Sequence, residues 1–506
     1  MELNGVEMQL TCGVTMIASL RDDLSAARFS VESLTALWGP DAAAALHRGH
    51  RVPAFRALSA TAESRLSTLA RLFVLGVPVS VDAFATAVPT FGVDGAEHLG
   101  LVRIEGGMAH PLLDVRPYSF VDAHGVGSWW IASDLGELAT GAALREDHVL
   151  GVGGASMTLS GLMIGRPVRR ALDLGTGCGI QALHASRHSE HVVATDISRR
   201  ALEFAALNAQ LNGVTNIEFR LGSLFDPVAG ELFDHIVSNP PFVITPRADG
   251  VPAYEYRDGG MVGDALVAAV IAGAAEHLSP GGIAQLLGNW EYRSGQLGLD
   301  RVAEWIRPTG LDAWVIEREV QDAALYAETW IRDGGTRPGP EFDRLSEAWL
   351  DDFACRGVTG VGFGYLTLRR GSSGFGRYEQ LDGPVGAGLG PHIEQSLASH
   401  DWLAGLDDEE LSRKLLTVAG DVTEERHYWP GDADPTVMTL RQGGGFQRSY
   451  PLDTGLAALV GACDGELSIR AIVAAIAQLL EVDEAALLAE LLPGIRELVF
   501  AGVLRR

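Results

Sequence analysis

Apolar and polar positions alternate in seven short segments between residues 168 and 370, and stretches with helical periodicity separate most of them. The strand-like segments read VRRALDLGTG, EHVVATDIS, IEFRLGS, FDHIVSNPP, GGIAQLLGN, AWVIERE and VGFGYLTLRR. Strands that alternate with helices favour a mostly parallel, doubly wound sheet. We therefore expect an α/β domain over residues 119–370, in which the last strand forms an antiparallel hairpin with the sixth.

The chain before this domain has mainly helical periodicity. The helical pattern runs from about Met16 to Leu75, and GVPVSVDAFATAV adds a turn and a helix with Ser80 as its N-cap. Two short strands then flank a Gly-Gly pair, which is a hairpin signal. Helices followed by a hairpin predict a winged-helix-like domain over residues 1–118, with a purely structural helical lobe as the alternative. Whether residues 1–15 belong to the native chain stays open.

The chain after the α/β domain begins with a glycine-rich stretch, residues 371–394, which predicts a linker. Residues 395–506 then contain amphipathic helices and end in a strand-like FAGVLRR, and their pattern predicts a second winged-helix-like domain. This last region has 9 Lys and Arg residues against 18 Asp and Glu residues. We expect it to contact a protein or the α/β domain, because its charge disfavours nucleic acid.

The whole chain has the same acidic character. Its 506 residues are too many for one hydrophobic core, which agrees with several domains. The formal net charge of −26 opposes tight, non-specific binding to phosphate backbones, although a local basic patch stays compatible with it.

The cysteines and the N-terminus exclude several other classes. Cys12, Cys178, Cys355 and Cys463 lie far apart, so the sequence predicts no zinc site, no disulfide framework and no bound metal. The N-terminus lacks the basic region of a signal peptide, and no apolar run reaches the roughly 20 residues that span a bilayer. The expectation is a soluble, cytoplasmic protein without a membrane partner.

A glycine-rich loop, Asp173-Leu174-Gly175-Thr176-Gly177-Cys178-Gly179, follows the first strand of the predicted sheet. Glycines at alternate positions let the backbone turn tightly and approach a ligand closely. The helix that opens at IQALHAS would present its free N–H groups to that ligand. The third glycine comes one residue too early for the dinucleotide-binding spacing, and Asp173 would repel a pyrophosphate. The loop therefore favours a cationic ligand with an amino-acid end.

Two further strand ends complete a candidate nucleoside site. Asp196 and Ile197 follow the second strand, where a carboxylate can accept hydrogen bonds from both hydroxyls of a ribose. Ser223-Leu224-Phe225 follow the third strand and offer backbone N–H groups and an apolar face to an adenine.

The fourth strand runs into a rigid corner, Asn239-Pro240-Pro241-Phe242. Two consecutive prolines cannot continue the hydrogen bonding of a strand, and they hold the backbone still. The Asn239 side-chain oxygen and the Pro240 carbonyl can each accept one N–H of a planar NH₂ group, on which Phe242 can stack. A plain turn at the strand end is the alternative, because Asn-Pro is a common turn signal.

The order of these motifs resembles the class I S-adenosylmethionine-dependent methyltransferases, over about residues 145–370. The resemblance implies a Rossmann-like, seven-stranded methyltransferase sheet and S-adenosyl-L-methionine as the cofactor. It also implies that Asp173 to Gly179 wrap the methionine part, that Asp196 holds the ribose and that Ser223 to Phe225 flank the adenine. More narrowly, the NPPF motif is similar to that of N-methyltransferases, namely release-factor glutamine, adenine-N6 and guanine-N2 rRNA methyltransferases.

The methyl acceptor stays open at this stage. The segment Asp258-Gly259-Gly260 resembles a loop of the release-factor glutamine methyltransferases and, with the acidic surface, favours a glutamine or amide side chain of a protein. The winged-helix-like flanks and the other NPPF families favour an amino group of an RNA or DNA base. A small-molecule acceptor and a non-enzymatic scaffold also remain alternatives. Separately, the chain is a possible homo-oligomer.

A segment upstream of the glycine-rich loop departs from these families. Residues 147–164 read DHVLGVGGASMTLSGLMI. They are predicted either to cover the cofactor, with Ser156 and Thr158 as contacts, or to lead structurally into the sheet.

Overall fold

The computed structural model describes residues 16–141, 144–252, 254–371, 373–386 and 388–506. Cys12 and the rest of residues 1–15 lie outside the described residues. Whether residues 1–15 belong to the native chain therefore stays open. The chain packs as two compact units. Unit 1 comprises the described residues up to Ser160 together with Arg166–Gln380, and unit 2 comprises Gly161–Gly165 and Leu381–Arg506.

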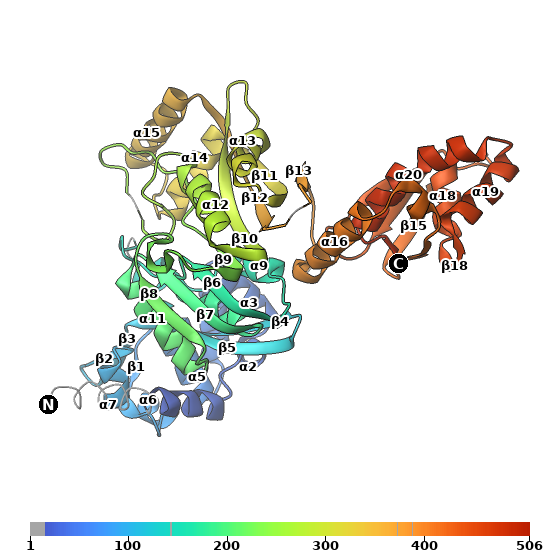
Figure 1. The fold of residues 1–506 in the computed structure, drawn as a ribbon. Helices are drawn as coiled ribbons and strands as arrows, with labels where there is room; N and C mark the ends of the chain where they lie inside the picture. The colour runs from blue at the N-terminus through green and yellow to red at the C-terminus, as the bar shows by residue number, and fades with distance from the viewer. Residues whose placement is uncertain (1–15, 142–143, 253, 372, 387) are drawn as a thin grey trace. The chain divides into compact units, whose positions relative to one another are not determined.

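An eight-stranded sheet organises unit 1 (Figure 1). The strands lie in the order β13-β11-β12-β10-β9-β6-β7-β8. Neighbours from β10 to β8 pair in parallel, whereas β12 is antiparallel to both β10 and β11. All seven strands expected from the alternating pattern are present, which confirms the Rossmann-like α/β fold. Their bounds are β6 (Val168–Leu174), β7 (Ser189–Asp196), β8 (Ile217–Leu221), β9 (Phe233–Ser238), β10 (Leu278–Arg293), β11 (Asp312–Asp322) and β12 (Val358–Arg369).

The eighth strand, β13 (Gly376–Gln380), corrects the predicted linker. It pairs in parallel with β11, and Trp314 Nε1 on β11 donates to Glu379 Oε1 at 2.7 Å. The strand is only five residues long and lies in a glycine-rich stretch, so the composition of that stretch predicted a linker. The structure also corrects the expected hairpin of the last two predicted strands: their pairing is antiparallel, but α14 (Ala323–Asp333) and α15 (Pro340–Arg356) lie between them in the chain.

Helices pack against the sheet in two separate cores. One core includes side chains of α10 (Ile180–Ser186) and α11 (Arg199–Leu211), and the other includes those of α12 (Ala265–His277) and α13 (Gly298–Ile306). Short 3₁₀ turns, η2 (Asp226–Val228) and η3 (Arg307–Thr309), connect neighbouring elements. This arrangement leaves the carboxyl ends of the parallel strands as the place for a site.

The N-terminal part of unit 1 is helical, with a small sheet of order β1-β3-β2. Ser80 is the N-cap of α6, since its hydroxyl accepts from Ala83 N at 3.2 Å, and the strands around the Gly-Gly pair form the expected hairpin. The winged-helix assignment stays a prediction. After a helical stretch at residues 16–26, the elements are α2 (Val31–Trp38), α3 (Pro40–His47), α4 (Val52–Ser59), α5 (Arg65–Leu69), the π-helical η1 (Ala70–Val74), β1 (Val79–Ser80), α6 (Val81–Ala87), α7 (Gly92–His98), β2 (Val102–Glu105) and β3 (Met108–Pro111).

A long two-stranded ribbon joins this helical part to the central sheet. It consists of β4 (Leu113–Asp122) and β5 (Gly125–Asp134), so the expected boundary at residue 118 falls inside a strand. Asn208 on α11 accepts from Ala132 N at 2.7 Å and donates to Ala132 O at 2.9 Å, in the manner of a neighbouring strand. Asn212, one turn later, makes the same pair of bonds with Trp130. The ribbon thus docks on α11, and both belong to one hydrophobic core.

Unit 2 contains more strands than its sequence pattern indicates. Three-stranded sheets of order β18-β14-β19 and β15-β16-β17 accompany its helices, and the expected terminal strand is β19 (Leu504–Arg505). The other elements are α16 (Leu389–Ala404), α17 (Asp408–Ser412), β14 (Leu415–Val418), β15 (Val422–His427), β16 (Val437–Gln442), β17 (Ser449–Leu452), α18 (Thr454–Gly461), β18 (Asp464–Ser468), α19 (Ile469–Leu480) and α20 (Glu484–Phe500). The second winged-helix assignment also stays a prediction.

Two further observations concern the described residues as a whole. Cys178, Cys355 and Cys463 are free thiols. No helix in the described ranges is both long enough and apolar enough to cross a membrane.

The docking of the ribbon leads to a stability prediction. Replacing Asn208 by Ala leaves the buried backbone groups of Ala132, and the Cys178 carbonyl that Asn208 also contacts at 2.8 Å, without partners. We expect the free energy of unfolding to fall by about 3 kcal/mol, measured by urea denaturation. Gln210→Ala, an exposed position on the same helix, is the matched control and should change it little. Equal losses from both variants would contradict the role of Asn208.

Candidate functional site

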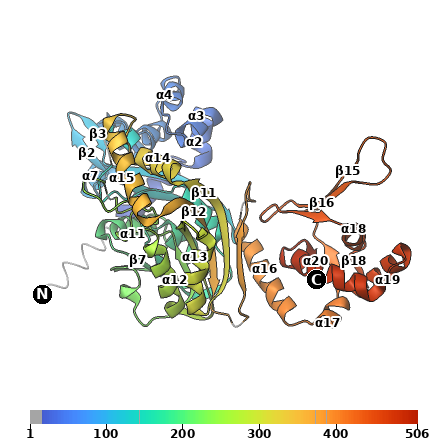
Figure 2. The ribbon, with the colours of Figure 1, turned by 90° about the horizontal axis from the view of Figure 1, so that it is seen from above.

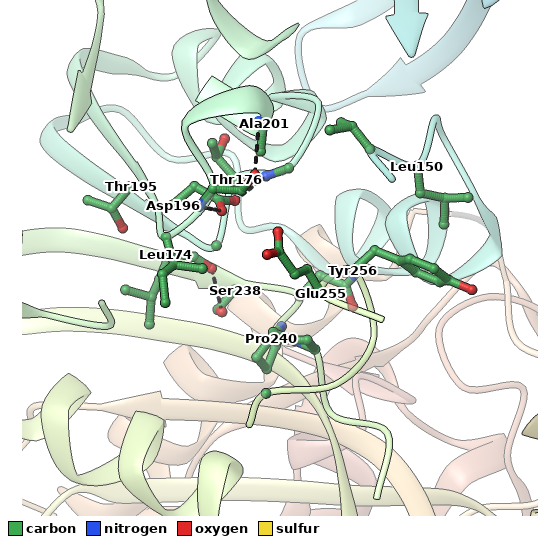
Figure 3. Close-up of a pocket in the computed structure, with 18 of the residues that line it drawn as sticks. Leu150, Leu174, Thr176, Thr195, Asp196, Ala201, Ser238, Pro240, Glu255 and Tyr256 are labelled. Atoms are coloured by element: carbon green, nitrogen blue, oxygen red, sulfur yellow. Dashed lines mark hydrogen bonds between the residues drawn. The ribbon is translucent and has the colours of Figure 1, made fainter. Parts of the chain in front are cut away.

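A cavity of about 360 Å³ lies where β6, β7, β8 and β9 end (Figure 3). The residues after each of these strands line it, at positions 174–178, 195–198, 222–224 and 238–241. Four motifs that the sequence placed at successive strand ends therefore meet at one cavity. This follows from the parallel pairing, which brings the carboxyl ends of neighbouring strands to the same edge.

The glycine-rich loop bends at this edge and is held from the neighbouring strand. Gly175 and Thr176 both donate their backbone N–H to Thr195 O at 2.9 Å. Gly175 and Gly177 have φ angles of +75° and +55°, and a Cβ at either position would meet nothing within 4 Å. The glycines are therefore required by backbone conformation at these two positions. Gly179 also has a positive φ, of +87°, and a Cβ there would in addition lie 2.9 Å from the Cβ of Ala205, so this glycine also allows α10 to approach α11.

Asp173 lies beneath this loop and does not line the cavity. Its side chain is fully buried, and its Oδ2 accepts from the Thr176 hydroxyl at 2.6 Å. Burial raises the pKa of Asp173 to about 7, against the opposing effect of hydrogen bonds from the Thr176 hydroxyl and the Ala182 backbone. The structure thus places this carboxyl as a support of the loop, whereas the sequence suggested contact with a cationic ligand.

Asp196 lines the cavity at the end of β7. Its Oδ2 accepts from Gly177 N at 2.9 Å and its Oδ1 accepts from Ser198 N at 2.8 Å. Burial raises the pKa of Asp196, while these backbone N–H groups act in the opposite direction. A carboxylate has about four acceptor positions, so capacity remains for two ligand hydroxyls. Ile197, also in the lining, is 69% exposed.

Only part of the predicted Ser223-Leu224-Phe225 motif lines the cavity. Ser223 and Leu224 line the cavity, and Leu224 has a φ of +46°, a strained conformation for a branched side chain. Phe225 does not line it. Its ring stacks on His277 at 4.7 Å between centroids and belongs to the core of the sheet, so the expectation that Phe225 faces an adenine is not met.

The corner after β9 is fixed to the glycine-rich loop. Ser238 Oγ donates to Leu174 O at 2.7 Å, which joins the ends of two adjacent strands. Asn239, Pro240 and Pro241 line the cavity. Phe242 is not part of this lining; its ring lies 5.6 Å from that of Phe363 between centroids, and it borders a small adjacent cavity with Pro241 and Gly259.

Three lining residues have buried polar atoms without a hydrogen-bond partner among the described residues. These atoms are Asn239 Oδ1, Gln181 Oε1 and Thr195 Oγ1. A buried polar group without a partner is costly, and such groups are normally satisfied by protein, water or a ligand. The three residues line the cavity, but the atoms themselves have almost no accessible surface in the ligand-free structure, so a ligand reaches them only after the side chains rotate.

Several residues of the lining were not assigned from the sequence, among them Gln181, Glu255 and Tyr256. In Figure 3, Glu255 projects its carboxylate into the space between the Thr176 loop and Pro240. Glu255 and Tyr256 precede the Asp258-Gly259-Gly260 segment, which also lines the cavity and in which Arg247 forms an ion pair with Asp258. The resemblance of that segment to a family loop was the available signal, and it identified the correct loop but not these two residues.

The upstream segment contributes to the cavity as well. Residues 148–151 and Ser156, which lies on α9 (Gly154–Leu162), are part of the lining, whereas Thr158 is not. Asp134 at the end of β5 positions this segment by accepting from Val149 N at 2.9 Å. A short helix, α8 (Glu137–Thr140), precedes it. The covering role of residues 147–164 stays a prediction.

No group of three His, Cys, Asp or Glu side chains within the described ranges is arranged to hold a metal ion.

Comparison with protein families divides the chain into three matched regions. Residues 153–304 match the methyltransferase small domain. Residues 26–112 and 394–506 each match a domain of unknown function, DUF7059 and DUF7782 respectively.

Curated relatives match within the central region. The chain is 39% identical over 132 residues to a release factor glutamine methyltransferase of Xylella fastidiosa, which covers 24% of this chain and 48% of that protein. It is 38% identical over 127 residues to a ribosomal protein uL3 glutamine methyltransferase of Xanthomonas campestris, with coverage of 24% and 41%. The chain thus spans less than half the length of these relatives.

Solved structures also match this region. A methyltransferase from Pyrococcus furiosus aligns with 19% identity and a TM-score of 0.26, over 41% of this chain and 78% of that one.

The buried carboxyl of Asp173 leads to a prediction of pH dependence. Its pKa of about 7 in the folded chain exceeds the ordinary value of 3.8, so between these pH values the folded state binds a proton that the unfolded state releases. Stability should therefore decline as pH rises from about 4 to 7, by on the order of 3 kcal/mol for this group. Asp173→Asn should make the decline smaller by this amount, while Asp114, whose pKa burial raises to about 6, continues to contribute.

The measurement is urea denaturation of the ligand-free protein across that pH range. Asp249→Asn, at an exposed position, is the control and should keep the slope of the unsubstituted chain. Parallel pH profiles for Asp173→Asn and the unsubstituted chain would contradict the assignment.

Proposed function

We propose that this chain, whose central domain belongs to the class I S-adenosylmethionine-dependent methyltransferases, methylates the side-chain amide nitrogen of a glutamine in a protein. The observation that carries the proposal is the position of Asn239. Its buried Oδ1 lacks a partner among the described residues, and the residue lines the same cavity as the glycine-rich loop and Asp196.

The residues of the cavity fit S-adenosyl-L-methionine. Nothing lies opposite Gly175 and Gly177 within 4 Å of where a Cβ would be, which leaves room for the amino-acid part beside the loop. Asp196 retains acceptor capacity for ribose hydroxyls. Leu224 and Ile197 offer apolar surface for an adenine, without Phe225. When bound, the cofactor supplies an electrophilic methyl group on a sulfonium.

The corner residues then act on the acceptor nitrogen. An amide nitrogen is a poor nucleophile, because its lone pair is delocalised. Asn239 Oδ1 and the Pro240 carbonyl oxygen each accept one N–H of the amide, which aligns the lone pair and stabilises positive charge that develops on nitrogen. Pro240 and Pro241 keep these acceptors fixed, so little ordering is required during the reaction. One of the two N–H protons leaves the amide nitrogen after the methyl group has been transferred.

The motif suggests that Phe242 stacks on the acceptor amide, and we propose a structural role for it instead. Because it packs on Phe363 outside the lining, we propose that it stabilises the corner from behind.

The choice of a protein amide is supported by two observations. The relatives that match the central region are named as glutamine methyltransferases of a release factor and of ribosomal protein uL3. The net charge of −26 opposes a nucleic-acid substrate. Since only the central part of the chain is matched, the protein substrate itself is left unspecified.

The function can be tested by transfer of radiolabelled methyl groups from S-adenosylmethionine into a cell extract. We expect label in a fraction that protease destroys and nuclease leaves intact. Acid hydrolysis of that fraction should release volatile methylamine, because an N-methylated glutamine amide yields it and a methylated base does not. Nuclease-sensitive label would overturn the proposal in favour of a base amino group.

A substitution at Asn239 tests the mechanism. Asn239→Ala removes one of the two acceptors, and we expect methyl transfer to fall by about 10²- to 10³-fold. Binding of S-adenosylmethionine, measured by calorimetry, should change by no more than about threefold. Transfer at a near-normal rate would refute the role of the corner, whereas loss of cofactor binding would show that the variant disturbs the site itself.

A further inference from the structure

The β15–β16 hairpin of unit 2 lies largely outside the core of its own unit. The two strands pair from Val422↔Gln442 to His427↔Val437, and residues 428–436 connect them. Over residues 422–442, all of which are described, only Leu440 and Gln442 are buried. Figure 2 shows the hairpin extending away from the helices of unit 2. The hairpin therefore has two accessible faces and an accessible tip.

The tip carries large apolar side chains in one group. Tyr428 is 50% exposed, Trp429 is 67% exposed, and Val437, at the end of the facing strand, is 51% exposed. Single exposed apolar residues are ordinary, but adjacent exposed tyrosine and tryptophan are typical of anchors in protein interfaces.

The tip is also acidic. Asp432 and Asp434 lie in the connecting segment, are exposed, and have no ion pair with any described residue. The basic residues nearby are already paired, because Arg426 contacts Glu424 at 2.7 Å and Arg441 contacts Glu425 at 2.8 Å. Two carboxylates beside two aromatic rings thus remain available to a partner.

We propose that this tip, defined by Tyr428, Trp429, Asp432 and Asp434, docks an arginine-rich polypeptide. A guanidinium group stacks on an indole ring and also donates to carboxylates, so this combination matches arginine in both respects. Phosphate backbones would be repelled by the carboxylates. A second copy of this chain, with a net charge of −26, is likewise disfavoured. The proposal is independent of the reaction at the cavity.

The test uses the full chain and a fluorescently labelled arginine-rich peptide, with anisotropy measured at physiological salt. The reference peptide has every arginine replaced by citrulline, which keeps the shape and removes the charge. Trp429→Ala and the double variant Asp432→Asn/Asp434→Asn should each weaken binding of the arginine peptide at least about fivefold. The citrulline peptide should bind no variant.

A charge-matched control separates docking from general attraction to an acidic protein. Glu481→Gln/Glu490→Gln removes two exposed carboxylates elsewhere in unit 2 and should leave binding unchanged. Unchanged binding by Trp429→Ala, or an equal loss in the control, would overturn the proposal. So would Trp429-dependent binding to phosphatidylcholine vesicles or to RNA in place of the peptide. Circular dichroism of each variant verifies that the fold is kept.

Discussion

The parallel pairing of β6 with β9 on one side and β7 on the other is the constraint on which the site depends. It brings the ends of three strands to one edge, and short hydrogen bonds then fix the loops that leave them. Thr195 O holds two N–H groups of the glycine-rich loop, Gly177 N binds Asp196, and Ser238 Oγ ties the proline corner to Leu174. A group held at the corner therefore faces a ligand held at the loop, without a flexible connection between them.

The ribbon strand β5, near the start of the predicted α/β domain, supports the same loop through Asn208. Asn208 Nδ2 donates one hydrogen bond to Ala132 O on the ribbon strand β5 and another to Cys178 O in the glycine-rich loop. The ribbon in turn ends at Asp134, which positions the segment around Val149 at the cavity. The strand β5, which lies outside the central sheet, is thus connected to the glycine-rich loop through Asn208 and to the segment around Val149 through Asp134.

The sequence allowed the seven strands and the order of the motifs to be predicted, because alternation and strand-end chemistry are local signals. It did not reveal β13 or the strands β14 to β18, which are short. Phe225 and Phe242 were assigned to the site from motif position alone. The ring of Phe225 packs against His277, and the ring of Phe242 packs against Phe363. Which side an aromatic ring takes is decided by tertiary packing, and the contribution of Glu255 depends on how a long loop folds back.

The meeting of four strand-end motifs at one cavity gives the main physical reason to regard it as a binding site, and three lining residues also carry unpartnered polar atoms. Asn239 Oδ1, Gln181 Oε1 and Thr195 Oγ1 come from three different elements and line one space. Each such atom costs about 1–3 kcal/mol when it is buried without a partner. Similar atoms also occur away from the cavity, for example Trp38 Nε1 and Asn289 Oδ1, so they do not mark the site by themselves. The retention of the three in the lining beside a strained Leu224 and two left-handed glycines is expected where a polar ligand completes the hydrogen bonding.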